Sequence, residues 1–310
     1  DISFCPNLIN LIYERGGDVG LTTASTSLKT FKKSFLGTIS LKMGNKDSIE
    51  EMRKGYYGGR TEIFRMYAKD DNYSWYDVKS LYPSVMADNE FPISTPRLSR
   101  FPKKDCYIDT IGITKAKVEA PKKIYIPLLP YRGNKLYFPI GKFEGYWDNS
   151  LLAEAKELGY KIEPSKTYDF KTDNIFKEYV ATFYKLKNDS KSKSASYVLA
   201  KHLLNNLYGK FAQHQESSMI VKTVSEKELN EIKDNIEEII DPDYNMYRVK
   251  SESKGNHFIP QISVHVTALA MLKLFRTLKE IHDKDYKVFY CDTDSIATDY
   301  NDLKCGSKLG

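Results

Sequence analysis

Two aspartates one residue apart, Asp292 and Asp294, stand where one apolar run ends and another begins. The runs at residues 287–291 and 295–298 have the composition of β-strands, so the pattern predicts a hairpin with carboxylates at its tip. Two like charges this close repel unless a cation lies between them. The alternative is a solvated Asp-Thr-Asp turn, because aspartate is common in turns.

A third aspartate lies near the end of an earlier strand-like run. Residues 73–78 alternate in polarity and include Asp77, and residues 79–86 have the pattern of a short helix. A carboxylate at a strand end, beside the start of a helix, is well placed to bind a metal ion. The free N–H groups of that first helical turn can bind anionic phosphate.

Two helices joined by a short polar loop are predicted at about residues 173–187 and 194–211. A loop this short favours antiparallel neighbours. On the second helix, Leu203, Leu204 and Leu207 fall on one side, where they can pack.

The other side of this second helix carries residues that could contact a nucleotide. Lys201, Asn205 and Tyr208 follow each other at i, i+4 and i+7, so they share one face. This face combines a cation, an amide and an aromatic ring, and Gly209 and Lys210 follow it. Such a surface could bind a phosphate group and a base. The alternative is an amphipathic helix with a solvated polar face.

Paired glycines stand beside aromatic and cationic residues in the stretch Tyr56-Tyr57-Gly58-Gly59-Arg60. The backbone at such glycines can approach a phosphate chain closely. A plain tight turn is the alternative interpretation.

The composition is that of a globular protein of a reducing compartment. The chain has 310 residues, 41% hydrophobic and 28% charged, which is enough for a sizeable core and more than one lobe. No apolar run reaches the ~18 residues of a membrane span, and the four cysteines lack zinc or disulfide spacing. A net charge of +6 and many aromatic residues beside Lys or Arg weakly indicate a polyanionic partner.

Two polar segments interrupt the chain. Residues 90–165 predict an irregular α+β insertion, with β-like runs at 112–118 and 123–129. Residues 214–256 form a second insertion with an acidic stretch and a basic end. A long core helix is predicted at residues 258–281, directly before the hairpin, so the fold class is α+β.

Three blocks in this order resemble the A, B and C motifs of family B DNA polymerases: Asp77-Val78-Lys79-Ser80-Leu81-Tyr82-Pro83, Lys201-His202-Leu203-Leu204-Asn205-Asn206-Leu207-Tyr208-Gly209 and Tyr290-Cys291-Asp292-Thr293-Asp294-Ser295. The protein-primed branch of phages, linear plasmids and organellar elements is the most similar. Tyr56-Tyr57-Gly58-Gly59 resembles that branch's Tyr-x-Gly-Gly motif, and the insertions fall where the branch has its terminal-protein regions. The likeness spans essentially the whole chain.

The resemblance implies a palm of antiparallel sheet with helices, two-helix fingers and two insertions, with exonuclease and thumb largely missing. The implied segments are the end of the exonuclease domain with the linker (1–60), palm (61–95), first insertion (96–168), fingers (169–213), second insertion (214–256) and truncated palm (257–310). Asp1 would lie near the last exonuclease aspartate, and the Lys-x-Tyr motif and thumb are not found before Gly310.

The implied activity is template-directed DNA synthesis, with nucleotidyl transfer from a dNTP to a primer 3′-hydroxyl or a protein hydroxyl. Two Mg²⁺ ions about 3.5–4 Å apart would neutralise the triphosphate and activate the hydroxyl, and Mn²⁺ could replace them. By the resemblance, Asp77 and Asp294 are the principal metal ligands. Asp292 supports the site, and the Val78 carbonyl adds a ligand.

The resemblance also implies nucleotide and DNA contacts. Lys201, with Lys187 as a weaker candidate, would contact the incoming triphosphate. Tyr208 would pack against the nascent base pair with Asn205 beside it, and Tyr82 would lie under the deoxyribose. The residues expected to contact DNA are Tyr56, Gly58, Gly59, Gly209, Lys210 and Thr267.

Two positions depart from the family pattern. Asn206 stands where serine is usual, and Met271 stands where the motif that begins at Thr267 has a primer-binding arginine. The implied partners are template-primer DNA, dNTPs and a terminal protein, with no membrane. The implied setting is intracellular, in a host cytoplasm or mitochondrion, and the resemblance includes polymerases encoded by viruses and plasmids.

Two other functions compete with polymerase activity. A non-catalytic module that binds nucleic acid or terminal protein would be favoured by the loss of a metal aspartate, and none is lost. A reverse transcriptase would usually have Tyr-x-Asp-Asp where this chain has Tyr290-Cys291-Asp292-Thr293-Asp294. It would also lack the Tyr-x-Gly-Gly block.

Overall fold

The computed structural model describes residues 9–10, 12–14, 16–20, 22–67, 73–213, 217–223, 225–251, 258–306 and 308–310. Asp1, expected near the last exonuclease aspartate, lies outside these residues. The chain divides into two compact units. One combines the residues up to Ala212 with those from Ile259 on, and the other is Gln213–Phe258.

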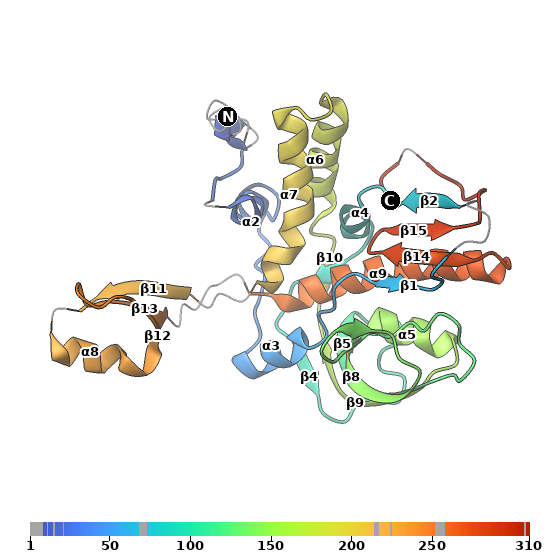
Figure 1. Ribbon diagram of the computed structural model, residues 1–310, viewed down its shortest axis with the longest axis horizontal. Helices are drawn as coiled ribbons and strands as arrows, with labels where there is room; N and C mark the ends of the chain where they lie inside the picture. Colours follow the sequence, from blue (N-terminus) through green and yellow to red (C-terminus); the bar gives the residue numbers. More distant parts are fainter. Residues whose placement is uncertain are drawn as a thin grey trace. The chain divides into compact units, whose positions relative to one another are not determined.

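A four-stranded antiparallel sheet in the first unit carries the hairpin predicted from the sequence. Its strands, in order across the sheet, are β1 (Thr61–Ile63), β14 (Val288–Asp292), β15 (Ser295–Thr298) and β2 (Ser74–Asp77) (Figure 1). β14 and β15 form the hairpin. The pairing of β15 with β2 brings together two strands from distant parts of the chain.

The long helix α9 (Pro260–Asp283) covers one face of this sheet. Cys291 of β14 and Ile296 of β15 are buried in one apolar cluster with Leu272 and Phe275 of α9. The first turns of α9 belong to a second cluster through residues such as Ile262. One helix therefore connects both parts of the core.

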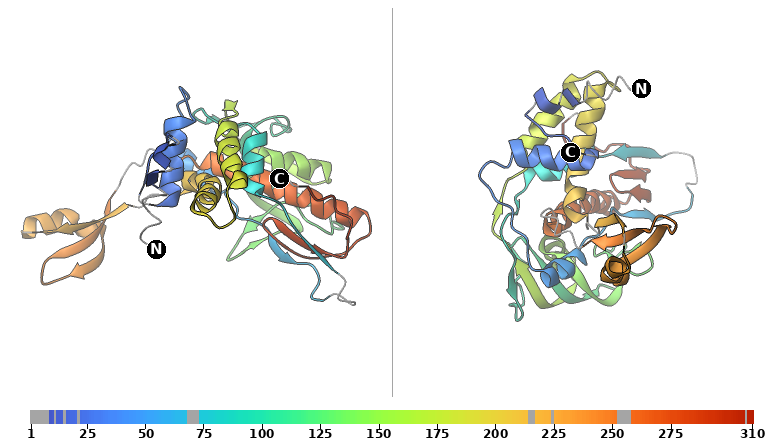
Figure 2. Two further views of the ribbon diagram at one scale, coloured as in Figure 1. Left: turned by 90° about the horizontal axis from the view of Figure 1, so that it is seen from above. Right: turned by 90° about the vertical axis from the view of Figure 1, so that its left-hand side faces the viewer.

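Four helices pack around the second apolar cluster: α2 (Thr23–Ser34), α4 (Leu81–Asp88), α6 (Lys177–Asp189) and α7 (Ala195–Ala212). α2 lies against α7 (Figure 2). α6 and α7 are the two predicted neighbouring helices, and the Tyr179 hydroxyl of α6 donates to the Leu203 carbonyl of α7 at 2.9 Å. α6 begins later than the sequence predicted, because Thr172–Asp173 forms a strand, β10.

A second four-stranded antiparallel sheet has the order β4 (Arg97–Ser99), β9 (Lys161–Asp169), β5 (Gly112–Ala120) and β8 (Gly141–Asp148). Helix α5 (Asn149–Glu157) follows β8, and Asp148 caps it by accepting from the Ser150 N–H at 2.9 Å. The other oxygen of Asp148 lies 2.8 Å from Nδ1 of His265 on α9. Because both side chains are buried, this pair ties the second sheet to α9.

The remaining elements of the first unit are short: α3 (Lys46–Arg53), β3 (Phe91–Pro92), β6 (Tyr131–Arg132) and β7 (Leu136–Tyr137). β3 pairs with β10, and β6 pairs with β7. Glu51 of α3 accepts from Lys166 at 2.8 Å and from the Tyr168 hydroxyl at 2.5 Å, so α3 is fixed to β9.

Residues 90–165 are more regular than the sequence predicted, because β5 and β8 are long paired strands. The β-like run at 123–129 was wrongly predicted to be a strand. Its Ile126, Leu128 and Leu129 are buried in the core, so burial rather than strand pairing explains its apolar pattern.

The unit Gln213–Phe258 contains β11 (Ser217–Lys222), α8 (Glu226–Ile232), a 3₁₀ turn (Lys233–Asn235), β12 (Ile236–Asp241) and β13 (Met246–Ser251). Its three strands have the order β11-β13-β12. Among the side chains described in this unit, Val249 is the only apolar one that is buried.

Candidate active site

The strand register brings Asp77 next to the tip of the hairpin. Asp77 on β2 is paired with Ser295 on β15, and Ser295 is paired with Asp292 on β14. The Val78 N–H donates to the Asp294 carbonyl at 2.7 Å, so the chain after Asp77 is held against the turn. Carboxylates from distant parts of the sequence meet at one corner of the sheet.

Asp294 and Asp77 are electrostatically coupled. Burial raises the pKa of Asp294 above its usual range, and the carboxylate of Asp77 raises it further. A like charge disfavours ionisation of its neighbour, so a cation between the two groups would relieve their repulsion. Among the described residues, no three acidic, histidine or cysteine side chains gather closely enough to hold a metal ion. Asp292 acts on the pKa of Asp294 in the same direction as Asp77 but more weakly.

Asp292 has different surroundings. Its exposed carboxylate accepts from the Thr61 hydroxyl at 2.9 Å and from the Thr293 hydroxyl at 3.1 Å. Two strand spacings, about 9–10 Å, separate its backbone from that of Asp77. The arrangement is thus a close pair, Asp77 and Asp294, with a third carboxylate fixed beside it.

Lysines from two helices and from the turn between β2 and α4 lie near one another beside Asp77. Lys187 of α6 donates to the Ser80 hydroxyl at 2.9 Å, at the start of α4. Burial lowers the pKa of Lys187, and the charges of Lys79 and Lys201 lower it further, while Asp77 acts in the opposite direction. A polyanion such as a triphosphate would relieve the repulsion that Lys187 experiences from Lys79 and Lys201.

Three tyrosines lie beside the carboxylates. The rings of Tyr82 on α4 and Tyr208 on α7 stack with their centroids 4.4 Å apart and their planes at 22°. Burial raises the pKa of both hydroxyls, and Asp294 and Tyr56 contribute to the increase in each case. The three tyrosines and Asp294 are therefore close enough to influence one another electrostatically.

The exposed face of α7 is the one that the sequence spacing predicted. Lys201 and Asn205 are exposed, while the three leucines of the other side are buried. A Cβ at Gly209 would meet nothing within 4 Å, so a ligand could approach the backbone there. Lys210 is half-buried. Asn206 donates to the Thr23 hydroxyl of α2 at 2.9 Å, which gives this unusual residue a role in helix packing.

The two adjacent glycines have different surroundings. A Cβ at Gly58 would meet nothing within 4 Å, so the backbone there is open to a ligand. Gly59 instead lies against Thr293 at the hairpin tip. Arg132 donates to the Tyr56 carbonyl at 2.9 Å and thereby holds the start of this stretch.

Two residues of α9 are not brought into this group. Thr267 is 5% exposed and donates to the Val264 carbonyl at 3.1 Å, so the expectation that it contacts DNA directly is corrected. Met271 is 4% exposed in the apolar core. An arginine at this place would put a charge in apolar surroundings.

The sequence analysis missed a partly exposed row with two aromatic rings, those of Trp75 and Tyr290, on the same face as the carboxylates. The row runs across all four strands and consists of Ile63, Tyr290, Ala297 and Trp75. Each of its residues is two positions along its strand from the row that contains Asp292 and Asp77. Residues two apart on a strand point to the same side. The Trp75 side chain is 56% exposed, and its ring lies 5.8 Å from that of Tyr290.

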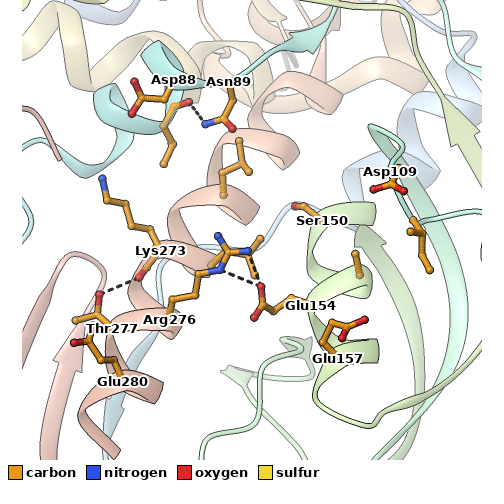
Figure 3. A pocket seen from close by; sticks show the side chains of 15 residues that line it. Asp88, Asn89, Asp109, Ser150, Glu154, Glu157, Lys273, Arg276, Thr277 and Glu280 are labelled. Carbon is orange, nitrogen blue, oxygen red and sulfur yellow. Dashed lines mark hydrogen bonds and ion pairs between the residues drawn. The ribbon is translucent and has the colours of Figure 1, made fainter. Parts of the chain in front are cut away.

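A cavity of about 840 Å³ lies elsewhere, among residues of α4, α5 and α9 (Figure 3). Within it, Arg276 points toward Glu154 and pairs with it at 2.6 Å. None of the three aspartates of the candidate site lines this cavity. The candidate site is therefore the open corner of the sheet and the helices beside it.

The sheet corner with its carboxylates, flanked by paired helices that carry lysines and a tyrosine, is the arrangement that the polymerase motifs imply. Residues 18–303 match the family described as DNA polymerase type B, organellar and viral, and the chain belongs to this family. No helix within the described residues is long and apolar enough to cross a membrane.

Curated relatives and solved structures agree with this assignment. The chain is 29% identical to the "Probable DNA polymerase" of Podospora anserina, over 94% of this chain and 27% of the relative. It is 26% identical to the DNA polymerase of Bacillus phage phi29, over 96% of this chain and 51% of the relative. The structure of phi29 DNA polymerase with primer-template DNA has the same fold, with a TM-score of 0.70 and 24% identity over 96% of this chain and 51% of that one.

The chain thus spans about half the length of the phage relatives and about a quarter of the fungal ones. The α+β fold with antiparallel sheets and helices, expected from the motifs, is confirmed.

Proposed function

We propose that this chain carries the polymerising centre of a DNA-directed DNA polymerase. The reaction is template-directed transfer of a nucleotidyl group from a dNTP to a primer 3′-hydroxyl, or to a protein hydroxyl. The observation that carries the proposal is the placement of Asp77, the last residue of β2, against the hairpin turn that contains Asp294, beside the lysines of α6 and α7.

The carboxylate pair fits divalent cations. Asp77, Asp294 and the Val78 carbonyl are oxygen ligands of the kind that Mg²⁺ prefers, and the mutual repulsion of the carboxylates favours a bound cation. Asp292 would support the site through its hydrogen bonds to Thr61 and Thr293. Two bound Mg²⁺ ions would supply charge neutralisation and an activated hydroxyl, and Mn²⁺ could replace them.

The lysines and tyrosines would hold the nucleotide. Lys201 and Lys187 would contact the triphosphate, since both lie where a polyanion would relieve their repulsion. Tyr208 would pack against the nascent base pair with Asn205 beside it. Tyr82, stacked on Tyr208, would lie under the deoxyribose.

The open face of the sheet would hold the template-primer. The remaining proposed DNA contacts are Tyr56, Gly58, Gly59, Gly209 and Lys210. Solved structures of phi29 polymerase contain primer-template DNA and incoming nucleotides, which supports these substrates. We further propose that a terminal protein serves as primer and that residues 96–168 and 214–256 are its contact regions, in replication of viral, plasmid or organellar linear DNA.

Primer extension with dNTPs and Mg²⁺ tests the proposal. The chain should be assayed both alone and joined to the coding sequence that flanks it in its genome. Asp77→Asn and Asp294→Asn should each abolish extension, whereas Asp302→Asn, a change at an exposed aspartate outside the group, should not. DNA binding in a gel-shift assay without Mg²⁺-dependent extension would instead support a non-catalytic binding module.

A further inference from the structure

The hairpin tip is bonded to the backbone that precedes β1. The Thr293 N–H, between the two aspartates of the hairpin, donates to the Arg60 carbonyl at 2.8 Å. The Cys291 thiol lies 3.8 Å from the same carbonyl oxygen. One carbonyl therefore contacts the hairpin on both sides of Asp292.

The tip needs such support because its backbone is strained. Thr293 has a φ of 56°, in the left-handed region that β-branched residues rarely adopt. Residues in such conformations persist only where their surroundings hold them. The Thr293 hydroxyl also donates to Asp292 at 3.1 Å, so its side chain has a fixed direction.

Gly59 provides the space for this contact. A Cβ at Gly59 would lie 2.8 Å from the Thr293 Cβ and closer still to its hydroxyl and methyl groups. Threonine is stiff at χ1, so it could relieve this clash only by moving its backbone or by losing the bond to Asp292. The neighbouring Gly58 has open space at the same position and provides a matched comparison.

The Arg60 side chain fixes the supporting carbonyl from the other direction. The guanidinium is 1% exposed, donates to Glu62 at 2.5 and 2.8 Å and donates to the Pro127 carbonyl at 2.7 Å. It also lies over the Phe138 ring, 4.0 Å from the centroid. A buried guanidinium with these partners cannot shift without leaving polar groups unpaired.

We propose that Gly59 and Arg60, here named the hairpin seat, act as positioning residues for the Asp292–Asp294 turn. The seat sets where Asp294 lies relative to Asp77 and links the turn to the segment that contains Pro127 and Phe138. The catalytic consequence rests on the proposed polymerase function. The structural consequence, that the turn is held in one position, does not depend on the proposed polymerase function.

Hydrogen exchange of the peptide that contains Thr293 tests the seat without any assay of activity. Gly59→Ala should speed exchange of this peptide about fivefold or more, the effect expected when a backbone hydrogen bond is lost. Gly58→Ala should leave its exchange unchanged. Arg60→Met should speed exchange as Gly59→Ala does. Equal protection in the parent and Gly59→Ala would overturn the proposal, even if Arg60→Met failed to fold.

Steady-state kinetics then test the catalytic consequence. Gly59→Ala should lower kcat about 100-fold, the effect typical of a misplaced catalytic group, with a much smaller change in the KM for dNTP. Thr293→Gly removes the clashing atoms, so adding it to Gly59→Ala should restore part of kcat. A Gly59→Ala variant with parental kcat refutes the catalytic role of the seat. A parent chain that fails to extend primers even with its flanking sequence refutes the polymerase proposal instead.

Discussion

The ring of Tyr82 is fixed by its stacking on Tyr208, so it cannot move aside easily for a bulkier sugar. If it lies under the deoxyribose, Tyr82→Val should admit ribonucleotides by opening space for a 2′-hydroxyl. We expect the preference for dNTP over rNTP, measured as a ratio of kcat/KM, to fall at least about tenfold. Tyr82→Phe keeps the ring and should keep the preference. Undiminished discrimination by Tyr82→Val would show that another group excludes the 2′-hydroxyl.

Asp294 should make the metal-free protein pH-sensitive. Its pKa is raised in the folded state by burial and by Asp77, so the folded chain binds more protons than the unfolded chain between the two pKa values. Its contribution to stability therefore falls as the pH rises through that window, and the loss persists at neutral pH.

Asp294→Asn removes this repulsion and provides the test. In EDTA, we expect the variant to have a higher Tm than the parent at neutral pH and a flatter dependence of Tm on pH above about 4. Added Mg²⁺ should raise the Tm of the parent and should have little effect on the variant. If Mg²⁺ stabilised both proteins equally, the carboxylate pair would not be the metal site.

The elements around the site were predictable from the sequence where polar residues end apolar runs. Asp77 ends strand β2, Asp294 lies in the turn that follows β14, and the spacing on α7 separated Lys201 and Asn205 from the buried leucines. Strand β9 was missed because it is rich in Lys and Glu and contains Pro164, so its side chains do not reveal its pairing with β5. The sequence also shows Arg60 as an ordinary cation, because its burial depends on Pro127 and Phe138, which only folding brings to it.

The open face of the sheet formed by β1, β14, β15 and β2 is a candidate DNA surface. Trp75 is one of two tryptophans, and the other, Trp147, is fully buried and donates to the Pro130 carbonyl. Primer-template DNA should therefore quench the fluorescence of Trp75 alone. Trp75→Ala should weaken DNA binding about 5- to 100-fold, the range for one base stacked on an aromatic ring. Trp75→Phe should retain most of the affinity.

Fluorescence anisotropy at several salt concentrations separates stacking from charge. Loss of an uncharged ring should leave the salt dependence of binding unchanged, because that slope reflects phosphate contacts. Quenching that persists in Trp75→Phe, or parental affinity in Trp75→Ala, would exclude the row of Trp75 and Tyr290 as a DNA surface.

At the scale of the whole molecule, the unit Gln213–Phe258 and the second sheet differ in what they contribute to the core. The second sheet supplies Trp147 to the cluster that contains much of α9, and α5, which follows it, supplies Leu152. The unit Gln213–Phe258 supplies no described residue to either large apolar cluster. The chain leaves and re-enters the first unit at neighbouring points, since the Ile259 N–H donates to the Phe211 carbonyl at 2.9 Å.

Replacing residues 213–258 by a short Gly-Ser linker should therefore leave the first unit folded. We expect one cooperative thermal transition within a few degrees of the parent Tm, because little apolar surface is lost. Excision of residues 97–169 should instead abolish that transition, since it removes Trp147 and Leu152 from the core. If residues 214–256 contact a terminal protein, the linker variant, tested with its flanking sequence, should extend DNA primers but not initiate on the protein. Loss of both activities together, in a folded variant, would show that this unit serves polymerisation itself.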